Sequence, residues 1–279
     1  MDEAVREREP FHWRTAISYK TKDRIVVRGY DLNDLVGNLS FTEMAYLVWR
    51  GELPSAAYAR MLDALLVSLA EHAFSPSAAA CRFVASGGVP LHVGVAGGML
   101  AIGTLHGTAD RPAELFQEAV ARMERESFSM NEAARQIAGE ARKEGRRLPG
   151  YHHAQHIRDP RTARLLELSD ENGVSGVYVA MARAIEAATE EFWGRCIYLN
   201  GPGAMGAICL DMGFDPELIK GVFLLSRTVS LVAHTNEEMH REKGWRASTN
   251  APIVQPLDLS LQRPEFYDGP RDRPVPRRG

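Results

Sequence analysis

The sequence predicts a mostly helical protein. Helix-capping signals precede most of its apolar runs, Gly or Pro follows them, and strand-like alternation of apolar and polar residues is confined to one short stretch. A chain of 279 residues, 45% hydrophobic and 25% charged, can bury a substantial core, as one large domain or as a domain with a smaller insert. We therefore expect helices throughout, apart from one hairpin.

The start of the chain carries these signals clearly. Residues 24–31 (RIVVRGYD) alternate as strands do and contain a glycine, which predicts a small hairpin. Ser40 followed by Glu43 is a capping box, and Gly51 ends the helix that it begins. Ser75 and the proline after it predict a second helix start, with a stop at the glycines that follow.

Residues 83–109 contain no Asp, Glu, Lys or Arg, a length that could span a bilayer. The segment also contains two histidines, a proline and many glycines, and such a segment packs closely against other helices more readily than it enters lipid. We expect a buried helix and no membrane.

Further helices are predicted downstream. Residues 112–144 have the charged, amphipathic pattern of an exposed helical pair. The other predicted helices cover residues 160–170, 174–192, 203–212 and 216–241. After Asn250 six prolines prevent a helix and predict an extended tail over this or a neighbouring subunit.

Charge and cysteine content exclude several classes of function. A net charge of -3 gives no basic field for nucleic acid. Cys81, Cys196 and Cys209 form neither a disulfide framework nor a zinc-ligand spacing, so no metal site is predicted. The charged N-terminus lacks the order of a signal peptide, and a cytoplasmic location is expected.

Histidines lie near the predicted helix boundaries, where functional residues gather. They are His72, His106, His152, His153 and, shortly after, His156. A single histidine of this kind is more often structural than catalytic. The group together indicates a functional site.

Four segments carry a family resemblance. They are RGYDLNDLVGNLSFTEMAYLVWRGELP, EHAFSPSAAACRFVASGG with GVAGGMLAIGTLHGTA, LPGYHHAQHIRDPRTARLLEL, and LLSRTVSLVAH. Over residues 27–246 the chain resembles the citrate synthase superfamily. The short length and the EEMHREKGWR stretch are similar to the citryl-CoA lyase-like branch.

The resemblance implies an all-α fold with two domains and an active-site cleft between them. Residues 1–107 and 206–279 would form the large domain and residues 108–205 the small one. A homodimer is implied as well. No bound cofactor is expected; a coenzyme A (CoA) thioester would be a substrate together with a polycarboxylic acid.

The resemblance also implies roles for individual residues. His106 would hold the thioester carbonyl, and His153 would polarise the keto group. His72, Arg161 and Arg227 would bind the substrate's carboxylates, for which the planar guanidinium is well suited. Arg161 could instead form a salt bridge at a helix start, whereas Arg227 lies on an apolar helix, where an arginine needs an anion.

Two departures bear on the reaction. Pro202 stands where the family has a catalytic aspartate, so citrate synthesis is not expected. In the CoA loop His152 replaces a glycine and Ala154 replaces the usual arginine.

Three functions follow. The first is a C–C lyase acting on a citryl-CoA-like thioester, with His152 or water supplying the proton. The second is decarboxylation, hydration or tautomerisation of a di- or tricarboxylic acid without CoA. The third is a non-catalytic ligand-binding homologue.

Overall fold

The computed structural model describes residues 14–153 and 156–245, and within them the protein is helical apart from a three-stranded sheet. The strands are β1 (Ser18–Lys20), β2 (Ile25–Val27) and β3 (Tyr30–Asp31). The helices are α1 (Leu32–Leu35), α2 (Phe41–Arg50), α3 (Ala56–Leu69), α4 (Pro76–Ala85), α5 (Leu91–Leu100), α6 (Asp110–Glu126), α7 (Met130–Lys143), α8 (Pro160–Glu171), α9 (Val177–Trp193), α10 (Gly201–Asp211) and α11 (Pro216–Arg241). The predicted all-α class is confirmed.

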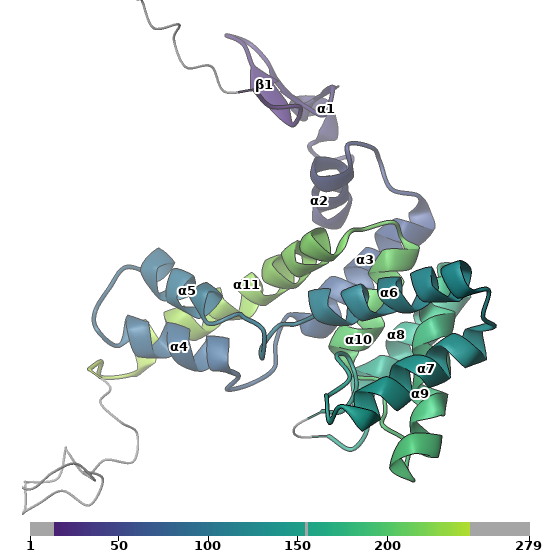
Figure 1. The fold of residues 1–279 in the computed structure, drawn as a ribbon. Helices are drawn as coiled ribbons and strands as arrows, with labels where there is room; N and C mark the ends of the chain where they lie inside the picture. Colours follow the sequence, from purple (N-terminus) through teal and green to yellow (C-terminus); the bar gives the residue numbers. More distant parts are fainter. Residues whose placement is uncertain (1–13, 154–155, 246–279) are drawn as a thin grey trace, which may run out of the picture.

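The helices form a body and an arm (Figure 1). α3 and α6 to α10 make the body, with the sheet, α1 and α2 projecting from it. α4 and α5 lie away from the body and pack on α11, which runs from the body into this arm. One continuous cluster of buried side chains fills the body, including Phe116, Met181, Met205 and Phe223.

The predicted hairpin and the first helix are confirmed. β2 and β3 pair antiparallel around a turn at Arg28 and Gly29, and β1 adds a strand that we did not predict. In α2 the Ser40 hydroxyl accepts the Glu43 N–H and the Glu43 carboxylate accepts the Ser40 N–H, which is the predicted capping box. Gly51 ends the helix in the left-handed conformation.

Helix α3 is central to the body and was missed. The Ser55 hydroxyl caps it by accepting the Tyr58 N–H at 3.1 Å. Its apolar side chains Met61, Leu62 and Leu65 are fully buried. Both the cap and the helical spacing are visible in the sequence and would have predicted it.

The stop predicted at the glycines after Ser75 is confirmed, but the glycine-rich helix that follows is shorter and less buried than predicted. α4 ends at Ala85, and α5 covers only Leu91–Leu100, less than a bilayer requires. A Cβ on Gly98 would lie within 3 Å of Leu231 and Cys81, so the glycine lets α5 approach both α11 and α4. The opposite face of the arm is not buried, since Leu100 is 87% exposed.

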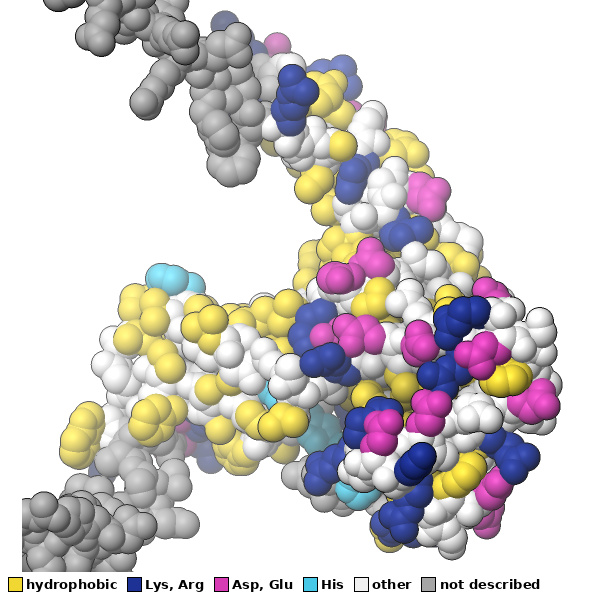
Figure 2. All heavy atoms as spheres, viewed as in Figure 1, with side chains coloured by type: hydrophobic (Ala, Val, Ile, Leu, Met, Phe, Trp, Pro, Cys, Tyr) yellow, Lys and Arg dark blue, Asp and Glu magenta, His cyan; other side chains and the backbone are white. Residues whose placement is uncertain are grey.

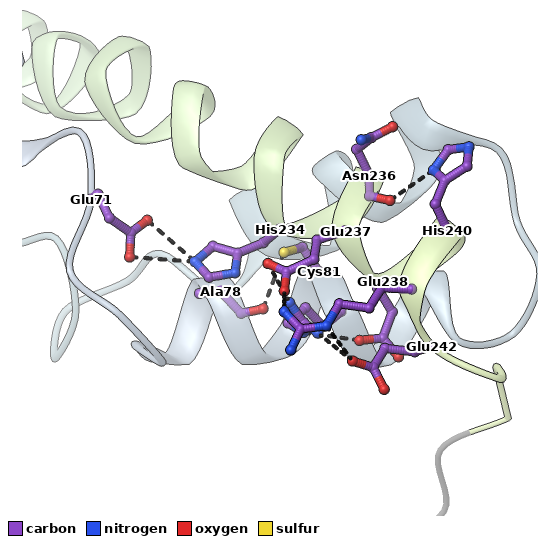
Figure 3. A network of polar contacts seen from close by, with 11 residues as sticks. Glu71, Ala78, Cys81, His234, Asn236, Glu237, Glu238, His240 and Glu242 are labelled. Atoms are coloured by element: carbon purple, nitrogen blue, oxygen red, sulfur yellow. Dashed lines mark hydrogen bonds and ion pairs between the residues drawn. The ribbon is translucent and has the colours of Figure 1, made fainter.

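A polar network fastens the arm to α11 (Figure 3). The Arg82 guanidinium on α4 lies 2.9 Å from the Glu238 carboxylate and 3.3 Å from that of Glu237. The Glu71 carboxylate, just before His72, lies 3.2 Å from His234 Nε2 on α11. The loop that carries His72 is thereby held against α11.

The downstream helices agree with the prediction within a few residues, and α11 agrees at both ends. α6 and α7 form the expected amphipathic pair. The predicted domain boundary at residues 205–206 falls inside α10, which packs on α6, α8 and α9. The division into two domains stays a prediction.

Two further points concern chain segments. Among the described helices, α11 alone is long and apolar enough, by length and composition, to cross a membrane. It carries two buried charged side chains, Arg227 and Glu238. The predicted extended tail after Asn250 lies outside the described residues.

Candidate active site

The loops between the helices bring most of the predicted residues together. His72 lies between α3 and α4, and His153 lies between α7 and α8. Arg161 is in the first turn of α8, and Arg227 is near the middle of α11. His106 was expected at the end of a helix; it lies instead in the loop after α5, where its carbonyl accepts the Gly103 N–H at 2.9 Å.

Three imidazole rings form the centre of the cluster. The ring centroid of His72 is 5.4 Å from that of His153 and 6.1 Å from that of His156, and the latter two are 4.5 Å apart. Burial lowers the pKa of His72, and the positive charges of Arg161 and Arg227 lower it further. Burial also lowers the pKa of His153, against a smaller opposing effect of Asp159.

His106 is held by a residue that we did not predict. Its Nε2 lies 2.8 Å from Ser77 Oγ, and the ring meets Phe223 edge-on. Burial, and then the charge of Arg227, lower the pKa of His106 to about 4. His106 is therefore neutral at pH 7.

Arg227 is a buried cation without a matching anion. It is 2% exposed, and its Nη1 reaches only Ser75 Oγ, at 3.4 Å. Its Nε has no hydrogen-bond partner, and it forms no ion pair among the residues that the structure describes. Burial lowers its pKa; the charge of Glu71 opposes this effect, and the charge of Arg161 adds to it more weakly. A buried guanidinium with an unpartnered Nε is a candidate group for binding an anion.

Arg161, by contrast, already has a carboxylate partner. Its Nε and Nη2 donate to the Asp159 carboxylate at 2.9 and 2.7 Å, and Asp159 also accepts the Gly201 N–H at 2.8 Å. These bonds hold the pKa of Asp159 well below its usual range although burial opposes them. The salt-bridge alternative for Arg161 is thus present in the structure, and any substrate contact would be additional.

His152 has a backbone conformation that favours glycine, the residue that the family resemblance gives for this position. His152 has a φ of +64°, in the left-handed region that glycine adopts without strain. Its N–H donates to the Tyr198 carbonyl at 2.8 Å, and its carbonyl accepts from Asn200 Nδ2 at 2.7 Å. These bonds join His152 to the start of α10, where Pro202 occupies the first turn.

Two adjoining hollows open beside this loop. One, of about 270 Å³, is lined by Arg142, Arg146, Arg147, Arg195, Trp193 and His152, together with apolar residues. The other, of about 430 Å³, shares His152 and Arg195 and extends to His153 and His156. Four arginines and an aromatic ring therefore line the first hollow, a combination suited to phosphates and a base, and the second hollow connects it to the histidine cluster.

Some supporting residues had no sequence signal strong enough to single them out. Ser77, Glu71 and His234 act through contacts between segments that are distant in the chain. Asp159 could have been found, because an Asp directly before Pro and Arg is an N-cap signal.

Comparison with known proteins defines the class. The family model "Citrate synthase, C-terminal domain" matches residues 54–248. A glyoxysomal citrate synthase of Cucurbita maxima is 30% identical over 256 residues, covering 86% of this chain and 46% of the relative. A 2-methylcitrate synthase of Shewanella oneidensis is 26% identical and covers 74% of this chain. The chain thus spans about half the length of the curated relatives it matches.

Solved structures agree. The chain superimposes on citryl-CoA lyase of Hydrogenobacter thermophilus with a TM-score of 0.79 and 37% identity, covering 94% of this chain and 97% of the other. An ATP citrate lyase of Methanosaeta concilii in complex with (3S)-citryl-CoA shares the fold, with a TM-score of 0.72 at 21% identity. The chain belongs to the citrate synthase superfamily, in the citryl-CoA lyase-like branch.

Proposed function

We propose that the protein cleaves a C–C bond of a citryl-CoA-like thioester, releasing a keto acid and an acyl-CoA. The observation that carries the proposal is Arg227, a buried guanidinium beside His72 that has no anionic partner among the described residues. A polycarboxylic substrate supplies that anion. The likeness to citryl-CoA lyase along nearly the full length of both chains supports this substrate class.

By the family resemblance an aspartate is missing here, so another group must handle the proton at the acyl carbon in either direction of the reaction. Condensation needs a base that removes a proton from the methyl group of an acyl-CoA, and Pro202 stands at that position. Asp159 does not replace it, because Arg161 and the Gly201 N–H hold its pKa low and make it a poor proton acceptor. In cleavage the enolate carbon receives a proton, which His152 or water would supply in place of the aspartate.

The proposed reaction is a retro-aldol cleavage. The substrate's tertiary hydroxyl gives its proton to His153 as the C–C bond breaks, and the hydroxyl carbon becomes the keto carbon of the released acid. The electron pair moves into the thioester enolate, whose oxygen lies against the N–H of His106. The enolate carbon then takes a proton from His152 or from water, and the proton held by His153 passes back to that donor, so that each group regains its starting state. Preorganised donors of this kind stabilise the developing charge.

The arginine-lined hollow supports the use of CoA. Arg142, Arg147 and Arg195 would neutralise CoA phosphates, and Trp193 would stack on the adenine. The thioester end would then reach the histidine cluster through the second hollow, which shares His152 and Arg195 with the first.

The test is direct. Citryl-CoA is added to the purified protein, and oxaloacetate release is followed through NADH oxidation by malate dehydrogenase. We expect turnover that Arg227→Met abolishes, and Arg195→Ala should raise KM for the thioester with a smaller effect on kcat. A protein that neither cleaves citryl-CoA nor binds CoA would contradict the proposal.

A second candidate is a reaction on a di- or tricarboxylic acid without CoA, such as decarboxylation, hydration or tautomerisation. The observation that favours it is the His152 side chain, which replaces a glycine in the CoA loop and lines both hollows. In that case a polycarboxylate raises the melting temperature while CoA leaves it unchanged. A non-catalytic ligand-binding homologue remains the third candidate.

We also propose that the protein is a homodimer joined through the arm. Figure 2 shows apolar and uncharged side chains over the visible face of the arm, whereas charged side chains gather on the body. Phe83, Leu100 and Val229 are 60%, 87% and 66% exposed on α4, α5 and α11. An apolar surface shared by three helices is typical of a protein interface, and the family resemblance makes a second copy its occupant.

A further inference from the structure

The three central imidazoles also have the arrangement of a metal-ligand set. One nitrogen from each of His72, His153 and His156 lies within 4.8 Å of the other two, and all three side chains are partly buried. No metal site was predicted, because Cys and His do not have a metal-ligand spacing along the chain. The fold brings the loop before α4 against the loop before α8 and so creates the cluster.

We propose that His72, His153 and His156 bind a divalent transition-metal ion, such as Zn²⁺, Co²⁺ or Ni²⁺, and that the bound ion excludes the polycarboxylic substrate. Three neutral imidazoles with an open fourth position form a common zinc-binding arrangement. The competition, though not the metal binding itself, rests on the function proposed above.

The geometry requires only small adjustments. Zinc–nitrogen bonds are about 2.0 to 2.1 Å long. The three nitrogens now lie within 4.8 Å of one another and must move closer together to bind one ion. All three rings are on loops, where side-chain rotation can provide this shift. The Nδ1 of His153 accepts the His156 N–H at 3.3 Å, a long bond whose loss costs little.

The surrounding charges determine which ions fit. Arg161 is neutralised by Asp159, but Arg227 is not neutralised and opposes any cation nearby. Mg²⁺ and Ca²⁺ prefer oxygen ligands and gain little from imidazole. Zn²⁺, Co²⁺ and Ni²⁺ bond well to imidazole, and this bonding offsets the repulsion by Arg227. The site is therefore expected to select transition metals.

Competition with substrate follows from the shared ligands. His72 is expected to donate an N–H to a substrate oxygen, and His153 to accept the hydroxyl proton on its lone pair. An imidazole nitrogen whose lone pair is bonded to a metal can do neither. Metal and polycarboxylate would thus compete for the same imidazole nitrogens of His72 and His153.

The test uses the full chain titrated with Co²⁺, followed by the visible absorption of the protein-bound ion. We expect binding of one ion per chain, weakened about 10-fold or more in His156→Gln, whereas His92→Gln, an exposed histidine on α5, binds as the parent does. Mg²⁺ should not compete. Absent Co²⁺ binding in the parent, or equal binding in His156→Gln, would overturn the proposal.

His156→Gln also separates the two proposals, because His156 has no assigned role in the reaction. In the parent, Zn²⁺ should abolish the rise in melting temperature caused by a tricarboxylate. In His156→Gln the rise should persist when Zn²⁺ is present. A third outcome is possible, in which His156→Gln loses metal binding but no acid raises the melting temperature of the parent or of the variant. That outcome would support the metal-site proposal and count against the proposed substrate. Circular dichroism confirms that each variant is folded.

Discussion

The Arg161 guanidinium donates two hydrogen bonds to the Asp159 carboxylate, at 2.9 and 2.7 Å. Arg227, the other arginine assigned to the substrate, has no such partner among the described residues. The two arginines therefore differ in what their removal does to the protein without ligand.

Replacing Arg227 with Met should leave the melting temperature of the ligand-free protein unchanged or raise it, because it removes a desolvated charge and keeps the volume. The rise in melting temperature with oxaloacetate or citrate should disappear, since losing one partner of a buried charge pair costs about 2 to 5 kcal/mol, or roughly thirtyfold or more in affinity. Differential scanning fluorimetry measures both. An unchanged response to acids would show that Arg227 is structural.

Arg161→Ala should behave differently. It leaves the buried Asp159 carboxylate without its two strongest donors, so we expect a loss of about 2 kcal/mol of stability even without ligand. Urea unfolding measures this loss, with Arg164→Ala, an exposed arginine on the same helix, as the matched control. Equal stability of the two variants would contradict the structural role of the Asp159 pair.

The protein should have no useful citrate synthase activity, far below the order of 10 per second of an ordinary enzyme. Pro202→Asp should fold, because Asp is favourable in the first turn of a helix, and should yield a trace of condensation between acetyl-CoA and oxaloacetate. Pro202→Asn, of similar shape and without charge, should yield none. Ordinary turnover in the parent would contradict the role assigned to position 202.

Most helix boundaries and the buried arginine could be predicted from the sequence, because the signals for them lie within a few neighbouring residues. Caps and stops lie within a few residues of one another, so α2 and α11 were predicted closely, and an arginine on the apolar helix α11 predicted the buried cation. The exposed face of α5 could not be predicted, because a run without charge does not tell which side meets other helices. Nor could Ser77, whose contact with His106 depends on how the first turn of α4 meets the loop after α5.

His106 should produce a measurable dependence of stability on pH. Its pKa is about 6.5 in an unfolded chain and about 4 in the folded protein. Between these values the unfolded state holds a proton that the folded state does not, so stability from this group is complete above about pH 6.5 and falls as pH drops towards 4. Unfolding measured across this range should show a shallower acid-side decline in His106→Gln than in the parent.

The catalytic role of His106 is tested separately by kinetics. His106→Gln and His153→Gln should each lose about 100-fold or more in turnover while still binding the acid. The double variant should be little worse than the worse single one, because both residues serve one transition state. Fully multiplicative losses would show independent roles, and unchanged turnover in His106→Gln would favour the reaction without CoA.

The proposed dimer interface can be tested by substitutions in the arm. Phe83→Asp and Val229→Asp introduce charges on the exposed apolar face and should convert a dimer to a monomer in size-exclusion chromatography with light scattering. Ala121→Asp, exposed on α6, should not. A parent protein that is monomeric at all concentrations would exclude this interface.

Helix α11 extends from the body into the arm as one element, with Arg227 midway and Leu231 and Thr235 against the glycines of α5. At about 1.5 Å per residue its 26 residues form a rod of roughly 39 Å. A shift imposed on the arm end is therefore transmitted to the guanidinium. If the arm is the dimer interface, dilution that separates the subunits should lower the specific activity. A substitution in the arm, far from any reacting atom, should likewise lower the rate as an active-site substitution does.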